Sequence, residues 1–247
     1  MTARAGAALL LLMMTIMLPG CVVFRHDLAR RPLATAPGTA DVAAARRALE
    51  HRRWGVAVAR AEQAVVLDGA DGDRRALLGT AYFRAGRFAS AARAFADALS
   101  LREADAATAL HLSLALIASG QQEAARGVLT RHAALLPAAD RGLALALAGD
   151  PREGVEVLMA AMRVPGADAR TRQNLALALA LAGEWPDAYF LVGLDLPPAQ
   201  ARQRILDWMR FAHPADAATQ VATLMRITPA PDPGVPAALT LRLADSR

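Results

Sequence analysis

The chain has 247 residues, of which 55% are hydrophobic and 4% aromatic, and its formal net charge is +5. Alanine and leucine, both strong helix formers, supply most of the apolar content, while β-branched, aromatic and turn residues are too sparse for a β-sandwich, so the composition favours an all-α fold. Every basic residue is an arginine, and these arginines are scattered among Asp and Glu instead of forming a stripe, which disfavours a nucleic-acid partner and favours solvated helix faces.

The first twenty residues have the pattern of a signal peptide. Arg4 supplies a positive charge, and the twelve residues from Ala7 to Leu18 are nearly all apolar. A membrane-spanning helix needs about 20 apolar residues, so this stretch is too short to cross a bilayer comfortably. We therefore expect residues 1–20 to direct export and to be removed.

The next residues, Leu18-Pro19-Gly20-Cys21, resemble the lipobox of bacterial lipoproteins, in which an aliphatic and a small residue precede the lipidated cysteine. The resemblance implies cleavage before Cys21 and lipidation of its side chain, which would hold the protein to a membrane. Val22 stands where an inner-membrane retention signal would have Asp, so the expected location is the periplasmic face of the outer membrane. Residues 21–40 would then form a flexible tether. The alternative is an incidental cysteine after an ordinary signal peptide or an uncleaved anchor.

Residues 77–101 contain the clearest structural motif of the chain. Leu78-Gly79, Tyr82, Gly86, Ala91, Phe95 and Ala98 fall at the offsets of the tetratricopeptide repeat, a 34-residue helical hairpin. Small residues such as Gly79 and Ala91 allow the two helices to cross closely, and Gly86 is placed to end the first helix. Such hairpins bury their remaining apolar faces by stacking on one another.

The motif recurs along the chain. A step of 34 residues takes Gly86 to Gly120 and Gly149 to Gly183, whereas the step between Gly120 and Gly149 is only 29, which predicts a shortened first helix in the fourth repeat. We therefore expect an array of about five hairpins over residues 41–195, with a degenerate first repeat.

Residues 174–183, NLALALALAG, alternate leucine with alanine as a half-buried strand would. On a helix, Leu175 and Leu179 form one row and Leu177 and Leu181 a second row on the other side of the axis. The repeat register favours the second interpretation, a helix buried on two sides.

After the array, residues 196–227 contain two further helical segments that we expect to cap the last repeat. Residues 228–247 are proline-rich, and we expect them to be extended or disordered.

Motifs for catalysis or metal binding are absent from the sequence. The five histidines lack the spacing of a helical metal pair, and there is no nucleophile elbow, phosphate-binding glycine loop or paired cysteine motif. We expect a non-enzymatic protein without cofactor, metal or small-molecule substrate. A hydrolase would need an acid/base pair in the groove, and none is visible.

Binding to another polypeptide is the better interpretation. In tetratricopeptide arrays the first helices of successive hairpins line a concave groove, and this resemblance implies a mainly apolar groove with arginine at its edges. The corresponding positions are Thr80, Phe83, Arg84, Leu110, Leu114, Ile117, Leu143, Leu147, Arg170, Gln173, Leu177 and Leu181. Such a groove suits an amphipathic helix or an extended apolar segment. The alternative is that the leucines belong to the core of the superhelix.

The segment from about 169 to 200 resembles the C-terminal signature of TadD-like proteins, which are tetratricopeptide lipoproteins of the tight-adherence (Flp) pilus. The matching residues are Arg172-Gln173-Asn174-Leu175-Ala176, Gly183, Ala188 and Asp195-Leu196. With the lipobox and the repeats, the resemblance covers most of residues 1–212. It implies a pilotin-like adaptor at the outer membrane that helps the pilus secretin to localise or assemble. A periplasmic scaffold for cell-wall synthesis or outer-membrane protein assembly is the alternative function.

Overall fold

The computed structural model describes residues 38–102, 105–212 and 217–241, and within these ranges the secondary structure is entirely helical. The α-helices are α1 (Thr39–Glu50), α2 (Trp54–Leu67), α3 (Gly72–Arg84), α4 (Phe88–Leu101), α5 (Ala106–Ala118), α6 (Gln122–Arg131), α7 (Ala138–Leu147), α8 (Pro151–Met162), α9 (Ala169–Leu181), α10 (Trp185–Gly193), α11 (Pro198–Ala212) and α12 (Ala217–Met225). A 3₁₀ turn, η1, spans Ala237–Leu239.

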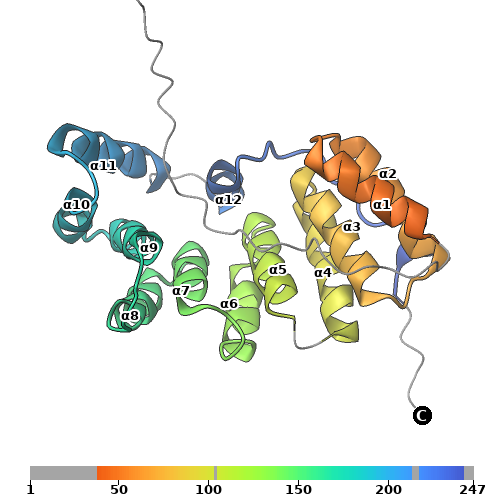
Figure 1. Cartoon of the computed structure of the whole chain (residues 1–247), viewed down its shortest axis with the longest axis horizontal. Coiled ribbons are helices and arrows are strands. Elements are labelled where there is room, and N and C mark those ends of the chain that lie inside the picture. The colour runs from red at the N-terminus through yellow and green to blue at the C-terminus, as the bar shows by residue number, and fades with distance from the viewer. Residues whose placement is uncertain (1–37, 103–104, 213–216, 242–247) are drawn as a thin grey trace, which may run out of the picture.

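The first ten helices form five antiparallel hairpins that stack in chain order (Figure 1). Helices that are consecutive in the chain pack on each other, as α3 does on α4 and α4 on α5, and the first helices α7 and α9 also pack on each other directly. In Figure 1 the second helices α6 and α8 lie on the lower side of the array, and α11 and α12 lie on the opposite, upper side. The expected all-α tetratricopeptide superhelix is therefore confirmed.

A glycine in the left-handed conformation ends the first helix of four hairpins. Gly86, Gly120, Gly149 and Gly183 have φ of 77°, 79°, 83° and 86°. In each case the next residue donates its N–H to the carbonyl five residues back, as Arg87 does to the Tyr82 carbonyl over 2.9 Å, which satisfies a carbonyl at the end of the helix. The periodic glycines of the sequence thus mark real helix ends.

Close approach of the two helices in a hairpin explains the small residues of the motif. A Cβ at Gly79 would lie 2.6 Å from the ring of Phe95, and a Cβ at Gly142 would lie 2.6 Å from the side chain of Leu158. The fourth hairpin also has the predicted shortened first helix, because α7 has 10 residues where α3, α5 and α9 have 13.

The leucine-alanine tract of residues 174–183 lies on helix α9 and not on a strand. Leu177 belongs to the main apolar core, while Leu175 packs in a second, smaller cluster with Leu158 and Ala178. The helix is therefore buried on two sides, and for this reason its sequence alternates leucine and alanine as that of a half-buried strand would.

The helices after the array differ from the expected cap. Helix α11 packs on α10 and α9, as a cap on the last hairpin would. Helix α12 does not join it there but packs against α5 and, more lightly, α7, near the middle of the array. Its buried residues Val221 and Ala222 join the main apolar core there, so burial of this face holds α12 on the array.

The residues after α12 continue back along the array. Between Arg226 and Leu241 the chain is mostly extended, and it reaches the turn between α3 and α4 before η1 contacts α2 (Figure 1). Ala230 donates its N–H to the Gly86 carbonyl over 3.2 Å, and Leu239 is buried. This part of the proline-rich tail is thus ordered by contacts with the first two hairpins.

Several sequence expectations fall outside the described residues. The expected signal peptide, the lipidation site Cys21 and the tether up to residue 37 are among them, as are the last six residues. Within the described ranges, none of the helices combines the length and apolar character that crossing a membrane requires.

Candidate partner-binding cleft on the concave face

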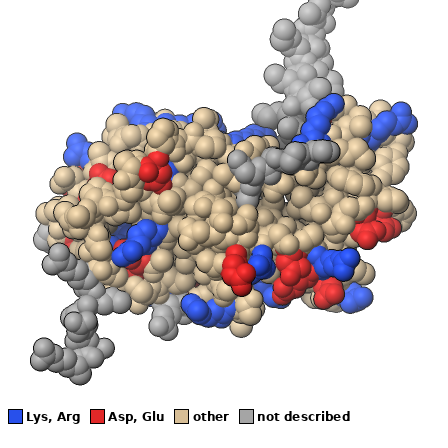
Figure 2. Space-filling view, turned by 180° about the vertical axis from the view of Figure 1, so that it is seen from behind, with Lys and Arg blue, Asp and Glu red and all other residues tan. Residues whose placement is uncertain are grey.

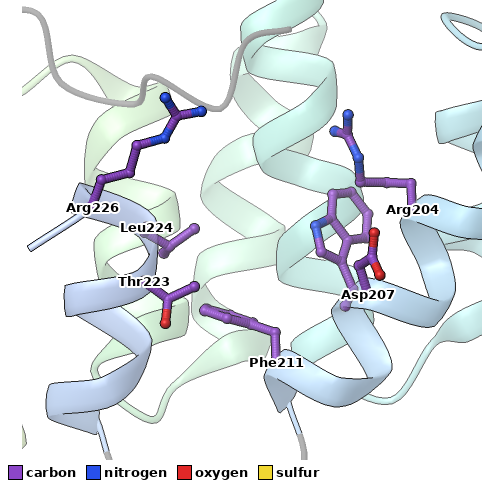
Figure 3. Close-up of a pocket in the computed structure, with 7 residues that line it drawn as sticks. Arg204, Asp207, Phe211, Thr223, Leu224 and Arg226 are labelled. Carbon is purple, nitrogen blue, oxygen red and sulfur yellow. The ribbon is translucent and has the colours of Figure 1, made fainter. Parts of the chain in front are cut away.

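The open part of the concave face is a cleft between α11 and α12 (Figure 3). Its volume is about 230 Å³, and its lining is mostly apolar. The residues that line it are Arg204, Asp207, Trp208, Phe211, Thr223, Leu224 and Arg226. The cleft is thus formed by residues from two helices that follow the array in the sequence.

Helix α11 presents its wall of the cleft because its other face is fixed to the array. Ala201, Ile205 and Trp208 recur at helical spacing and are buried, which seats α11 on the last hairpin. The neighbouring row carries Arg204 and Phe211, which therefore face α12. Figure 3 shows Phe211 pointing across the cleft towards α12.

Helix α12 supplies the opposite wall. Its buried residues Val221 and Ala222 face the array, so that the following Thr223 and Leu224 face the cleft. Arg226 adopts a left-handed conformation with φ of 53°, and Ile227 donates back to the Ala222 carbonyl over 2.8 Å. This is the same helix-ending arrangement as in the hairpins, with arginine in place of glycine.

The charges of the cleft favour an acidic partner group. Arg204 lies over the indole of Trp208, 5.9 Å from the ring centroid, which is a favourable cation–π geometry. In Figure 3 the guanidinium groups of Arg204 and Arg226 lie at the same end of the cleft, one on each wall. Asp207 is engaged with Arg210 over 2.8 Å. The cleft therefore suits an apolar side chain next to a carboxylate.

Most of the groove residues expected from the sequence are covered. Seven of them are buried in the main core, in the same cluster as Val221 and Ala222 of α12; these are Phe83, Leu110, Leu114, Ile117, Leu143, Leu147 and Leu177. Helix α12 lies on α5 and α7, which carry five of the seven. These side chains are therefore part of the apolar core, and α12 packs on the two helices that carry most of them.

The remaining five expected groove residues are half-buried. Thr80 donates its hydroxyl to the Ala76 carbonyl over 2.9 Å, so its polar atom serves its own helix. Burial lowers the pKa of Arg84, and the nearby charge of Arg52 lowers it further. Leu181 packs partly against both apolar clusters.

The other two half-buried residues lie on α9. Arg170 donates to the fully buried carboxylate of Asp140 on α7 over 2.7 Å. The side-chain oxygen of Gln173 is buried and has no hydrogen-bond partner among the described residues. Neither residue lines the cleft between α11 and α12.

Some of the residues that resemble the TadD-like signature join separate parts of the last two hairpins. Arg172 forms an ion pair with Asp195 through two of its nitrogens, and this hydrogen bonding raises the pKa of Arg172. Asn174 donates to the Ala139 carbonyl over 3.1 Å and so ties α9 to the start of α7. These contacts give the signature a structural role in the last two hairpins.

Sequence reasoning missed the aromatic lining of the cleft. Trp208 and Phe211 stand close together in a chain with only 4% aromatics, which is the one local signal that could have marked this segment. The opposing wall could not be found in this way, because its position depends on the long-range packing of α12.

A second hollow lies on the other side of the array, between α4 and α6. Its volume is about 550 Å³, and alanine and glycine form much of its lining. Leu112, Leu116, Arg93 and Arg131 also line it. Over the face shown in Figure 2, basic and acidic side chains lie interspersed and leave a broad uncharged area. No continuous basic stripe crosses the described residues on that face.

Metal ligands are not clustered among the described residues, where no group of three His, Cys, Asp or Glu side chains could hold an ion.

No known protein family and no curated protein matches this chain in sequence. Among solved structures, it is similar to a crystal structure of MamA protein with a TM-score of 0.52 and 17% identity, over 70% of this chain and 92% of MamA. It is also similar to MamA from Desulfovibrio magneticus RS-1, from residue 41 to the end, with a TM-score of 0.52 and 18% identity, over 72% of this chain and 97% of the other. MamA has a helical-repeat fold of the tetratricopeptide type, so the likeness supports the same fold here.

Proposed function

We propose that this protein is a pilotin-like adaptor, anchored by lipid at the outer membrane, that helps the secretin of a tight-adherence pilus to assemble. The observation that carries the proposal is a scaffold of stacked tetratricopeptide hairpins whose concave face leaves an apolar, arginine-edged cleft open to a partner. Folds of this kind recognise polypeptides through such surfaces. The choice of the secretin as partner rests on the resemblance to TadD-like proteins.

The cleft selects the chemistry of the partner segment. The half-buried Phe211 and Leu224 offer apolar contacts beside the buried Trp208, and the exposed Arg226 offers charge-assisted hydrogen bonds at one end. An amphipathic helix or an extended segment with an apolar anchor and a neighbouring Asp or Glu satisfies both requirements. Covering such an anchor would also protect a membrane-inserting protein from aggregation before assembly.

Anchoring explains how a small cleft could act efficiently. Lipidation of Cys21 would confine the protein to the membrane that its partner must enter, which raises the effective concentration of each for the other. Replacing residues 1–21 by an ordinary cleavable signal peptide should therefore release the protein into the soluble periplasmic fraction and reduce secretin assembly without weakening the cleft itself.

The test is a deletion strain complemented with cleft variants. Heat-resistant secretin multimers in membrane fractions, measured by immunoblot, should fall on deletion while pilin synthesis is unchanged. Arg226→Glu should fail to restore the multimers, because it reverses a charge at the cleft. The matched control is Arg202→Glu, since Arg202 is exposed on α11 and does not line the cleft. Unchanged multimers in the deletion strain would disprove the pilotin role.

A further inference from the structure

The chain's own C-terminal segment, residues 217–241, covers part of the surface that a partner would use. We call this segment the strap. We propose that the surface beneath the strap is a peptide-binding surface, and that a segment of a partner protein with the same pattern, an apolar helix followed by an extended proline-rich stretch with an aspartate, replaces the strap there. The proposal goes beyond the open cleft and concerns the surface that the strap hides.

The first attachment of the strap is helix α12. It packs against α5 and α7 with Val221 and Ala222 buried, and Leu224, Met225 and Ile227 are only partly buried against the core. This is a helix lying in a groove made by other helices, which is a common mode of recognition between separate proteins.

The second attachment is an aspartate at the start of α4. The N-cap residue of α4, Arg87, makes no side-chain capping bond. The carboxylate of Asp232 takes over this role, because it accepts the backbone N–H of Ser90 over 2.8 Å and also the Ser90 hydroxyl. Arg87 lies 3.6 Å from the same carboxylate. The start of α4 is thus a site that binds a carboxylate, and in this structure the carboxylate of Asp232 occupies it.

The turn beside this site is shaped for the strap. Gly86 has a φ of 77°, and a Cβ there would overlap the Thr228 carbonyl oxygen and lie 2.8 Å from the backbone nitrogen of Ala230. At Gly120, the equivalent turn of the next hairpin, a Cβ would meet nothing within 4 Å. The extended chain therefore lies directly on the turn of the second hairpin.

The third attachment is at the end of the strap. Leu239 is buried in the main core, and its carbonyl accepts a hydrogen bond from Arg75 over 3.0 Å. The same Arg75 nitrogen donates to Asp97 over 2.8 Å, so the arginine is held in place by the array. The donor of this hydrogen bond thus belongs to the hairpins, and it stays in place whether or not the strap is bound.

Between its attachments the strap is weakly held. Most residues from 226 to 238 are exposed, with Ile227, Asp232 and Val235 as the half-buried exceptions. Among the strap residues whose side chains the structure describes, 218–241, the buried ones are Val221, Ala222 and Leu239, whereas most hairpin helices bury several side chains each. A segment that relies on so few contacts opens more readily than the core, as peripheral units of proteins commonly do.

Each feature by which the strap binds to the array is one that another chain can supply. An apolar helix face, one carboxylate at a helix start beside an arginine and one leucine in a pocket need no residue peculiar to this protein. A second copy of this chain is the less favourable occupant. Its strap already binds its own array at an effective concentration of about millimolar, and it would have to leave that site to bind another copy. A different protein held at the same membrane can compete without giving up such a site.

The experiment measures exchange in residues 22–247, the chain without the expected signal peptide and the lipidated cysteine. The probe is a fluorescein-labelled synthetic peptide of residues 217–241, followed by fluorescence polarisation. A receptor with Asp232→Ala has a loosened strap and should bind the probe about tenfold more tightly than the parent. A probe peptide carrying Asp232→Ala should bind that receptor about tenfold more weakly than the natural probe, because α4 loses its cap. Glu156→Ala, at an exposed position on α8, is the matched receptor control and should behave as the parent.

Two outcomes would overturn the proposal. One is a probe that binds neither receptor, or both receptors equally. The other is a dimer of the Asp232→Ala receptor by light scattering, which would identify a second copy as the occupant. Hydrogen exchange on the parent protein gives an independent measurement: amides of residues 221–225 should exchange at least about tenfold faster than those in the middle of α5. Equal protection would show a strap that does not open. None of these readouts involves the secretin, so failure here leaves the proposed function to its own test.

Discussion

The carboxylate of Asp140 on α7 is fully buried, and Arg170 on α9 donates to it over 2.7 Å. The pair joins the first helices of the fourth and fifth hairpins. Arg170→Ala should lower the free energy of unfolding by about 3 kcal/mol, because it leaves a buried charge without this compensation. Urea denaturation followed by circular dichroism measures the change. Arg202→Ala, at an exposed arginine, is the control, and a loss below about 1 kcal/mol for Arg170→Ala would show that the pair is not important for stability.

The crossing of α3 and α4 depends on the absence of a side chain at Gly79. Gly79→Ala would place a Cβ 2.6 Å from the Phe95 ring, and we expect the free energy of unfolding to fall by about 1–3 kcal/mol. Gly127 offers a matched control within helix α6, since a Cβ there meets nothing within 4 Å. Gly127→Ala should therefore stabilise the protein by up to about 1 kcal/mol through helix propensity. Equal effects of the two substitutions would contradict the crossing argument.

The hairpins could be predicted because their determinants are local and repeated. Gly79 and Phe95 are only half a repeat apart, and the register that places Gly86 also places Gly120. Contacts within a hairpin and between neighbouring hairpins join residues that are close in the sequence. One recognised repeat is therefore enough to place the others. The shortened α7 followed from the same spacing.

The candidate cleft could not be predicted in this way. One wall of the cleft is formed by α12, so the cleft depends on where that helix packs. No pattern in the sequence of α12 indicates that it packs on α5. Asp232 and Ser90 are 142 residues apart, and no local pattern links them. The leucines assigned to the groove lie on the first helices of the hairpins, but whether they line a groove or belong to the core of the superhelix depends on packing that the local sequence does not determine.

The end of α1 contains an arginine where the other hairpins have glycine. Arg52 has a φ of 55°, which costs a residue with a side chain about 1 kcal/mol, and its charge also disfavours the charged form of the nearby Arg84. Arg52→Gly should therefore raise the free energy of unfolding by about 1 kcal/mol. Gly183→Ala, at the equivalent turn with φ of 86°, should lower it by a similar amount. Thermal unfolding of the two variants measures both, and two shifts of the same sign would refute the shared turn geometry.

Acid should detach the strap at Asp232, and the sign follows from its contacts. Burial by itself would raise the pKa of Asp232, but hydrogen bonds from the side chain and backbone of Ser90 and from the Gly234 N–H, together with the charge of Arg87, lower it below the ordinary value of 3.8. The attached strap therefore holds its proton less tightly than the detached strap does. The stabilisation from this contact is complete above pH 3.8 and is lost as the pH falls through the lower pKa of the attached state.

The Ser90 amide proton reports this titration directly, because it is the hydrogen that Asp232 accepts. Its chemical shift in an NMR titration should stay constant through neutral pH and change with a midpoint below 3.8. In Asp232→Asn the side chain cannot ionise, so this transition should disappear, while carboxylates elsewhere titrate as before. Arg87 remains protonated throughout this range and cannot produce the transition itself. A midpoint above the ordinary value would mean that Ser90 and Arg87 do not stabilise the charged carboxylate, and the cap on α4 would then be too weak to hold the strap.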